Sequence, residues 1–407
     1  MGMTTTGAAK YRKILQRVKP QIIIVEEAAE ILESHIVTTL GDSCKHLILI
    51  GDHKQLRPST TVYELAKKYE MDISLFERMV RNGVPCITLE EQHCMRPEIS
   101  KLLRREKLYP TLRDHETVLR YDKVKGVDVN IQFITHEEEE YFSGDSTSYL
   151  NPHEARYISA LCRYFLNQGY PKENITILTP YMGQVLLLRN EMPKSVFDGV
   201  RITAVDNFQG EENDIIVLSL VRSSLEINVS KRNPIGFVGI ENRICVALSR
   251  AKYGLFVLGN FKLLERSSQL WKEIIVELRK ANLVKPYLTL RCENHPEMYT
   301  YASTAHDFEN VPIGGCNKPC GKYLPCGHIC PRSCHVVDIL HEHVTCYRPC
   351  KKINPNCTLG HQCTKKCHQK CGDCKIVVVK VIPMCRHLAE LPCHLDPFTG
   401  FAMQSVK

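Results

Sequence analysis

The sequence lacks the long apolar runs that a membrane span requires. Its longest apolar stretches, such as Ile215–Val221, are far shorter than the ~20 residues that cross a bilayer as a helix. The first residues match neither a secretory signal, with its apolar segment, nor an Arg-rich transit peptide. We therefore expect no membrane span.

Cysteine is scarce in the first part of the chain. Five cysteines are scattered through residues 1–291, whereas fifteen lie between Cys292 and Cys393. Isolated cysteines are typical core residues of a reduced cytoplasmic or nuclear protein. The dense region, interleaved with histidines, is typical of metal binding. This change of composition predicts a domain boundary near Lys285 and Pro286, in a chain long enough for two to three domains.

A phosphate-binding loop is also missing, because no G-x-x-x-x-G-K-[ST] pattern occurs in the 407 residues. The absence matters because of the stretch QIIIVEEAAE at residues 21–30. Its apolar run, followed by Glu26 and Glu27, predicts a buried parallel strand that delivers carboxylates to the ligand-binding edge of a sheet. In nucleotide sites such carboxylates hold Mg²⁺ and orient the attacking water. Taken alone, the segment is explained as well by a strand followed by an acidic helix start.

Short β-rich runs alternate with helical patterns through the first 285 residues, which predicts parallel α/β sheets. The predicted strands are 22–25, 46–50, 86–91, 175–180, 201–205, 214–221 and 253–260. The predicted helices are 28–40, 74–82, 97–103, 152–168, 183–192, 241–251 and 270–281. Only two or three strands precede the point where the pattern restarts, too few for a doubly wound sheet. We expect the first sheet to be incomplete and further sequence to precede Met1.

Five motifs follow one another at strand ends and helix starts. They are GDHKQLRPS from Gly51, QHCMRPEIS from Gln92, TPYMGQ from Thr179, VDNFQGEENDIIVLSLVRS from Val205 and NRICVALSRAKYGLFVLGN from Asn242. In this order and spacing they resemble the second half of a superfamily 1 helicase of the up-frameshift type. The resemblance covers roughly residues 1–280. It implies RecA-like domains, ATP with Mg²⁺ as ligand, and movement on RNA, with DNA a weaker alternative.

The resemblance also implies roles for individual residues. Glu26 corresponds to the magnesium ligand, Glu27 to the catalytic base, Gln55 to the γ-phosphate sensor and Arg250 to the arginine finger, whose guanidinium stabilises developing phosphate charge. Nucleotide contacts are implied for Gln209, Gly210 and Glu212. Nucleic-acid contacts are implied for Thr4, Thr5, Thr179, Pro180 and Tyr181.

Three departures from this family pattern are visible. Cys94 stands where the family has a γ-phosphate arginine, and Arg96, two residues on, is the nearest substitute. Cys245 stands where the last motif usually has asparagine. The phosphate loop and its lysine are absent from these residues. A catalytically inactive, zinc-dependent platform that binds RNA or protein is therefore the alternative to an ATP-dependent helicase.

The cysteine-rich tail repeats one ligand pattern. The core H-x-C-x3-C-H occurs at His328–His335 and again at His361–His368, and a degraded third copy spans Cys385 to His394. Ligand-type residues repeated at fixed spacing predict zinc binding, with three or four sites. A disulfide scaffold, the alternative, would require an oxidising compartment. The ligand order of a RING-type ubiquitin ligase is absent.

The tail resembles the NF-X type of zinc finger, and the whole chain resembles the helicases that carry such fingers. The predicted zinc ligands are Cys292, His295, Cys316, Cys320, Cys326, His328, Cys330, Cys334, His335, Cys346, Cys350, Cys357, His361, Cys363, Cys367, His368, Cys371 and Cys374. The group is linked to RNA silencing and antiviral defence in the cytoplasm, with nuclear association. Protein partners through the tail are expected as well as RNA.

Together these features predict three parts. Residues 1–92 form a partial first RecA-like domain, 93–285 a complete second one, and 286–407 an irregular zinc-bound tail. The net charge of +8 suits a polyanionic partner.

Overall fold

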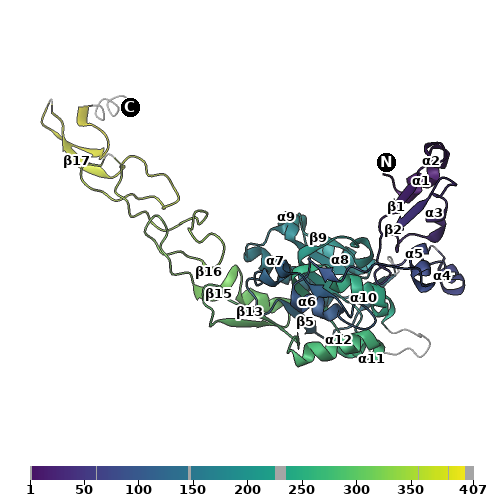
Figure 1. The fold of residues 1–407 in the computed structure, drawn as a ribbon. Coiled ribbons are helices and arrows are strands. Elements are labelled where there is room, and N and C mark those ends of the chain that lie inside the picture. The colour runs from purple at the N-terminus through teal and green to yellow at the C-terminus, as the bar shows by residue number, and fades with distance from the viewer. Residues whose placement is uncertain are drawn as a thin grey trace. The chain divides into compact units, whose positions relative to one another are not determined.

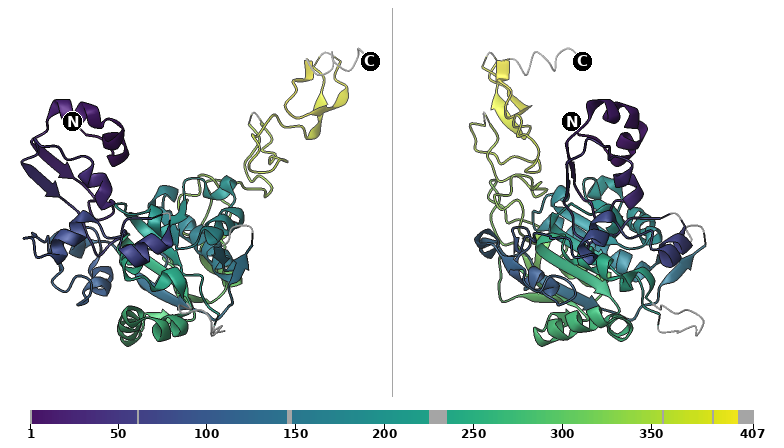
Figure 2. Two further views of the ribbon diagram at one scale, coloured as in Figure 1. Left: turned by 90° about the vertical axis from the view of Figure 1, so that its right-hand side faces the viewer. Right: turned by 45° about the vertical axis from the view of Figure 1, so that its right-hand side comes forward.

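The computed structural model describes residues 2–60, 62–144, 148–224, 235–355, 357–383 and 385–398. It divides into two compact units (Figures 1 and 2). The α/β unit comprises Met1–Cys292 and Pro296–Glu309, and the cysteine-rich unit comprises Glu293–His295 and Asn310–Lys407. Among the described residues, no helix is both long and apolar enough to cross a membrane.

The α/β unit begins with a small two-stranded sheet. Strands β1 (Ile22–Val25) and β2 (His46–Leu49) pair in parallel. The surrounding helices are α1 (Thr5–Lys10), α2 (Arg12–Val18), α3 (Glu33–Val37), α4 (Tyr63–Tyr69) and α5 (Leu75–Arg81). A core of Ala28, Ala29, Ile36, Leu75 and Phe76 joins this sheet to α3 and α5. The incomplete first sheet predicted from the sequence is confirmed.

Two elements differ here from their predicted extents. The helix expected over 28–40 shortens to α3, because the amide of Ala28 donates to the carbonyl of Ile50 (2.8 Å) and holds the start in a turn. The strand expected over 86–91 is limited to β3 (Glu91–Gln92), which pairs with β4 (Arg113–Asp114). Ile87 and Leu89 are 93% and 88% exposed. An apolar run that pairs with no neighbouring strand gains little by being extended.

A six-stranded parallel sheet forms the centre of the α/β unit. Its order is β12-β5-β11-β10-β8-β9. The strands are β5 (Ile131–Thr135), β8 (Ile175–Thr179), β9 (Arg201–Ala204), β10 (Asn213–Ser219), β11 (Ala251–Gly259) and β12 (Val284–Lys285). β8, β10 and β11 are buried almost throughout, as expected for a parallel sheet covered on both faces.

Helices cover this sheet on both sides. Figure 1 shows α7 (Pro152–Asn167), α8 (Met182–Glu191) and α9 (Lys194–Phe197) on one side, and α11 (Phe261–Ser267) with α12 (Gln269–Lys280) on the other. The remaining helices are α6 (Pro97–Ser100) and α10 (Glu241–Leu248). Trp271 of α12, the single tryptophan, is fully buried and donates to the carbonyl of Val238.

A hairpin extends the α/β unit beyond residue 285. β13 (Leu288–Arg291) and β14 (Tyr299–Ala302) pair antiparallel. The hydroxyl of Tyr157 in α7 donates to the carbonyl of Ala302 (2.9 Å). Because this buried contact attaches the hairpin to α7, the two units divide at residues 292 and 310, whereas the sequence places the boundary at 285–286.

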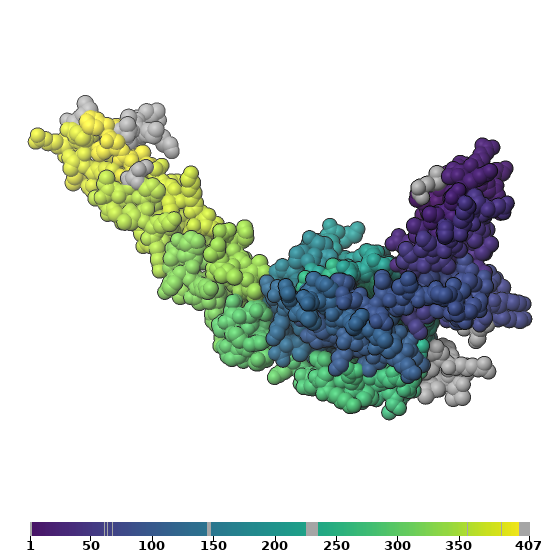
Figure 3. Space-filling model, viewed as in Figure 1, coloured from purple at the N-terminus to yellow at the C-terminus, as the bar shows by residue number. Residues whose placement is uncertain are grey.

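The cysteine-rich unit consists mainly of short loops, drawn in yellow-green to yellow in Figure 3. Its hairpins are β15 (Gly314–Pro319) with β16 (Ser333–His335), and β17 (Val377–Val381) with β18 (Leu388–Pro392). Its buried residues are largely cysteines and histidines. The predicted fold class is thus confirmed: an α/β protein with parallel sheets, followed by an irregular cysteine-rich tail.

We predict that Gly51→Ala destabilises the first sheet. A Cβ there would lie 2.8 Å from the backbone nitrogen of Ala29 and 3.1 Å from that of Ala28, so the backbone must shift. We expect a loss of about 1–3 kcal/mol, as for other overpacked sites, measured by native-state hydrogen exchange of residues 22–29. Gly41→Ala, where nothing lies within 4 Å of the added carbon, should leave exchange unchanged. Equal exchange in both variants would contradict the close approach.

Candidate functional site

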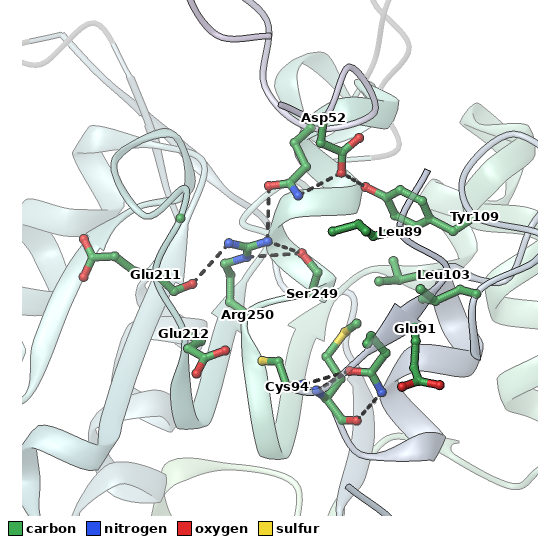
Figure 4. A pocket seen from close by; sticks show the side chains of 15 residues that line it. Asp52, Leu89, Glu91, Cys94, Leu103, Tyr109, Glu211, Glu212, Ser249 and Arg250 are labelled. Atoms are coloured by element: carbon green, nitrogen blue, oxygen red, sulfur yellow. Dashed lines mark hydrogen bonds between the residues drawn. The ribbon is translucent and has the colours of Figure 1, made fainter. Parts of the chain in front are cut away.

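A cleft in the α/β unit gathers residues from both sheets (Figure 4). It encloses a cavity of about 290 Å³. Its lining includes Asp52 and Gln55 after β2, Gly210, Glu211 and Glu212 before β10, and Ser249 and Arg250 before β11. Residues that the chain separates by almost 200 positions therefore surround one cavity.

Gln55 and Arg250 contact each other in this cleft. The Arg250 Nη2 donates to the Gln55 side-chain oxygen at 3.3 Å, and the Gln55 Nε2 donates to the Asp52 carboxylate at 2.9 Å. Lys54 donates its backbone N–H to the same carboxylate (2.9 Å). Asp52 thus orients the Gln55 amide so that its oxygen faces the guanidinium.

The Arg250 side chain is almost fully buried and closely held. It donates to the carbonyls of Val246 and Glu211, both at 3.1 Å, and to the Ser249 hydroxyl at 2.7 Å. Its positive charge has no carboxylate partner among these contacts. Neutral partners leave a guanidinium free to stabilise an anion that enters the cavity.

Glu27 faces the motif that precedes β10. Its carboxylate accepts a hydrogen bond from the Gln209 amide at 3.1 Å. Gly210 has a positive φ of 73°, and a Cβ placed there would lie 3.6 Å from the Glu27 carboxylate. Glu27 itself adopts a φ of 51°, which directs it away from the strand course. Glu26 and Glu27 are both exposed after β1 and do not line the 290 Å³ cavity.

Cys94 lies in the cleft beside Glu212. Burial raises the pKa of Cys94 to about 12, and its hydrogen bond to Glu212 acts in the same direction. Burial also acts to raise the pKa of Glu212, but the hydrogen bonds from Cys94 and Lys252 lower it overall. Cys94 is therefore a neutral thiol that donates to a carboxylate, and it cannot supply the positive charge of the arginine that it replaces.

Arg96 does not line the cavity. It is 5% exposed and donates to the carbonyls of Asp122 (3.1 Å) and Tyr253 (2.9 Å), and to the Glu98 carboxylate (3.1 Å). These bonds attach the start of α6 to β11. The side chain is thus committed to holding the fold rather than aimed at the cleft.

Two residues of the site were missed from sequence. The Tyr109 hydroxyl donates to the Asp52 carboxylate and lies 3.3 Å from the Cys245 sulfur, at the position where asparagine was expected. Burial is the main cause that raises the Tyr109 pKa, so its hydroxyl stays protonated. Asn242 donates to the carbonyls of His53 (3.1 Å) and Gln55. Only contacts distant in sequence reveal either residue, so no local pattern could have found them.

The predicted nucleic-acid residues have mixed surroundings. Thr4 caps α1 by accepting from the Gly7 amide (3.1 Å), and Thr5 is the first residue of that helix. Thr179 is fully buried and Tyr181 is 4% exposed, with its hydroxyl donating to the carbonyl of Ile235 (3.3 Å). Pro180 lies beside a small apolar cavity. Thr179 and Tyr181 therefore pack within the unit.

In the cysteine-rich unit, cysteine sulfurs and histidine nitrogens gather in clusters of metal-binding size. Within each cluster the candidate ligand atoms lie within 4.8 Å of one another. The sets are Cys320, Cys330, His335 and His341; Cys326, His328, Cys346 and Cys367; Cys357, His361, Cys374 and Cys393; and Cys350, Cys363 and Cys371. His295, Cys316 and Cys334 form a further cluster, and Cys292 precedes His295 by three positions in the chain.

The donor sets fit zinc. Four-ligand groups of thiols and imidazoles are the usual structural zinc sites. The His335 Nδ1 contacts the carbonyl of Val337 at 2.7 Å, which directs its Nε2 toward the cluster. Sequence reasoning missed His341 and Cys393 as ligands of these clusters, because their spacing departs from the repeated core. His368, a predicted ligand, places its Nδ1 against the carbonyl of Cys346 at 3.2 Å and is not among the members named above.

Known proteins resemble the chain over nearly all of its length. Residues 3–62 and 71–262 each match a family described as an AAA domain. The human NFX1-type zinc finger-containing protein 1 is 50% identical over 404 residues, covering 99% of this chain and 20% of the relative. The Caenorhabditis elegans homologue of that protein is 38% identical over 400 residues, covering 97% of this chain and 16% of the relative.

A fission yeast relative and one solved structure are also similar. The Schizosaccharomyces pombe helicase required for RNAi-mediated heterochromatin assembly 1 is 38% identical over 280 residues, which are 68% of this chain and 27% of that protein. An arterivirus nonstructural protein 10 helicase, solved with DNA, has a TM-score of 0.33 at 12% identity, over 66% of this chain and 55% of its own.

The two AAA matches, with the Gln55–Arg250 cleft in the parallel α/β unit, define a superfamily 1 helicase. The high identity extends through the cysteine clusters. The chain belongs to the up-frameshift-like helicases that carry NFX1-type zinc fingers. It spans about a fifth of the length of the human relative.

Arg96→Ala should destabilise the α/β unit by about 3 kcal/mol, because it leaves Glu98 and two carbonyls without a buried donor. Chemical unfolding followed by Trp271 fluorescence measures this, since the only tryptophan lies in that unit. Arg120→Ala, at a side chain 83% exposed, is the matched control. Unchanged stability of Arg96→Ala together with weaker nucleotide binding would contradict the structural role.

Chelation of zinc should unfold the cysteine-rich unit alone. Its described residues bury few apolar side chains besides the clustered ligands, so metal binding supplies much of its folding free energy. Hydrogen exchange of residues 310–398 should rise sharply with chelator, while the Trp271 unfolding transition stays in place. Added Zn²⁺, but not Mg²⁺, should restore protection. Loss of both units at one chelator concentration would contradict their independence.

Proposed function

We propose that the chain forms part of an ATP-hydrolysing RNA helicase. The observation that supports this most is the contact of Gln55 with Arg250 in one cleft, joined by a glutamate that faces Gln209 and Gly210. An amide, a guanidinium and a carboxylate at one site are the groups that phosphoryl transfer requires for sensing, charge stabilisation and water orientation.

Each residue has a role in this proposal. Glu26 holds Mg²⁺ and Glu27 orients the attacking water. Gln55 contacts the γ-phosphate, and Arg250 stabilises the charge that develops on it. Gln209, Gly210 and Glu212 contact the nucleotide. Glu26 stands where aspartate is usual in the family, and the longer side chain still provides the oxygen ligands that Mg²⁺ prefers.

RNA is the proposed nucleic acid. The net charge of +8 favours a polyanion, and the fission yeast relative is named for a role in RNAi-mediated heterochromatin assembly. Binding should weaken steeply with salt, because phosphate contacts dominate such affinity. Thr4 and Thr5 are the proposed contacts with most access to solvent, since Thr179 and Tyr181 are buried. We propose roles in RNA silencing and antiviral defence, in the cytoplasm and nucleus.

The cysteine-rich unit is proposed to bind protein partners as well as RNA. Between residues 292 and 407 thirteen lysines and arginines face nine acidic residues, and zinc-bound thiolates offset much of that positive excess. The unit therefore carries no strong electrostatic preference for phosphate.

A zinc-bearing platform without ATP turnover is the second candidate. It is favoured by one observation, the lack of a G-x-x-x-x-G-K-[ST] loop in the 407 residues. This platform would still bind RNA or protein through the same surfaces.

Glu27→Gln should abolish RNA-stimulated ATP hydrolysis, by roughly 100-fold or more, because an amide cannot accept the proton of the attacking water. The measurement is steady-state phosphate release in a polypeptide that carries a phosphate loop ahead of these residues. RNA affinity, measured in parallel, should stay unchanged. Glu33→Gln, at a glutamate that pairs with Arg78 outside the cleft, is the matched control.

The 407 residues alone separate the two candidates. Turnover that Glu27→Gln removes would favour an enzyme. RNA binding without turnover, both in this chain and in the longer polypeptide, would favour the platform. Hydrolysis at an equal rate in wild type and Glu27→Gln would exclude Glu27 as the base.

A further inference from the structure

Two clusters of the cysteine-rich unit share one construction. In each, a cysteine and a histidine from one turn, here called a turn pair, meet two cysteines from the next repeat, here called a clamp pair. The turn pairs are Cys326 with His328, and Cys357 with His361; their clamp pairs are Cys346 with Cys367, and Cys374 with Cys393. Successive repeats are thus linked through shared ligand sets.

A third turn pair follows the same register. The histidine of each turn pair lies six positions before a cysteine: His328 before Cys334, His361 before Cys367, and His387 before Cys393. Cys385 precedes His387 by two positions, as Cys326 precedes His328. The third repeat therefore provides Cys385 and His387 as its turn pair.

The backbone around this pair has the conformation of the other two turns. An amide upstream donates to the carbonyl of each histidine, from Leu324 to His328 (2.7 Å), from Asn354 to His361 (3.0 Å) and from Ile382 to His387 (2.9 Å). The residue just before each histidine is left-handed: Gly327 has φ 78°, Gly360 has φ 72° and Arg386 has φ 54°.

Arginine in the left-handed region is strained by roughly 1 kcal/mol, a cost that glycine avoids. The third turn keeps the conformation of the other two in spite of this cost. The turn is therefore built in the shape that directs a cysteine and a histidine toward one metal ion.

What distinguishes the third pair is its exposure. Cys385 is exposed, whereas the other fourteen cysteines from Cys292 onward are buried or half-buried. His387 is exposed as well, and neither residue belongs to the clusters described above. Two ligands leave half of a tetrahedral zinc site to be filled.

We propose that Cys385 and His387 form half of a zinc site that the same turn of a second copy of the chain completes. The clamp cysteines belong to their own clusters, and the sequence has no cysteine after Cys393. Two copies supply two thiolates and two imidazoles, a Cys₂His₂ set whose charge balances Zn²⁺. The proposal assumes zinc in the complete clusters, and the metal content of the variants tests that assumption separately.

The test uses the whole 407-residue chain loaded with zinc. Metal content is measured by elemental analysis and association by sedimentation velocity. We expect wild type to dimerise only with zinc and to hold one zinc more per two chains than Cys385→Ser/His387→Ala. That variant should remain monomeric and keep the zinc of its complete clusters. Cys86→Ser, at an exposed cysteine of the α/β unit, should behave as wild type.

Arg386→Gly and His387→Gln guard against a folding artefact. Glycine adopts the left-handed conformation freely, so Arg386→Gly should dimerise at least as well as wild type. His387→Gln keeps the thiol and should still lose the dimer. Equal zinc content and equal sedimentation in wild type and the double variant would overturn the proposal. A monomeric wild type holding one extra zinc per chain would also overturn completion by a second copy.

Discussion

The pairing of β10 with β11 is the constraint on which the nucleotide cleft depends. Asn213 opposes Ala251 in the parallel register, and the Asn213 amide donates to the carbonyl of Arg250 (3.0 Å). Since parallel strands begin at the same edge, the segments that precede them lie side by side. Arg250 consequently reaches the carbonyl of Glu211, and the buried sheet beneath keeps both segments rigid. A site for charge stabilisation needs this rigidity, because donors that must reorganise lose much of their effect.

The cysteine-rich unit follows a different physical principle. It has small hairpins and a modest apolar cluster around Leu324, too little to offset the entropy of ordering its loops. Its compactness therefore depends on ligand clusters that join residues 20 to 40 positions apart. The ligands of one repeat are shared with the next, so the repeats are linked in series rather than folded one by one. This construction makes an exposed turn pair such as Cys385 and His387 chemically incomplete.

The strand and helix periodicities, the uneven cysteines and the five motifs were sufficient to predict the α/β class, the incomplete first sheet and the metal-binding tail. Prediction failed where pairing decides structure. Residues 86–90 have strand-like composition, yet Ile87 and Leu89 stay exposed because strand formation depends on a neighbour. Local spacing suggested Arg96 as a phosphate ligand, but three buried acceptors hold its guanidinium elsewhere.

The sequence by itself determined which chemical groups this helicase-family chain carries: two glutamates after an apolar strand, an amide and an arginine in separate motifs, and repeated thiols and imidazoles. Periodicity and spacing are local properties, so they can be read from the chain. Tertiary structure alone decided which groups meet. Tyr109 reaches Asp52, Gln55 reaches Arg250, and Cys393 joins Cys357 and His361. These contacts depend on strand order and loop closure across many residues, which no local pattern encodes.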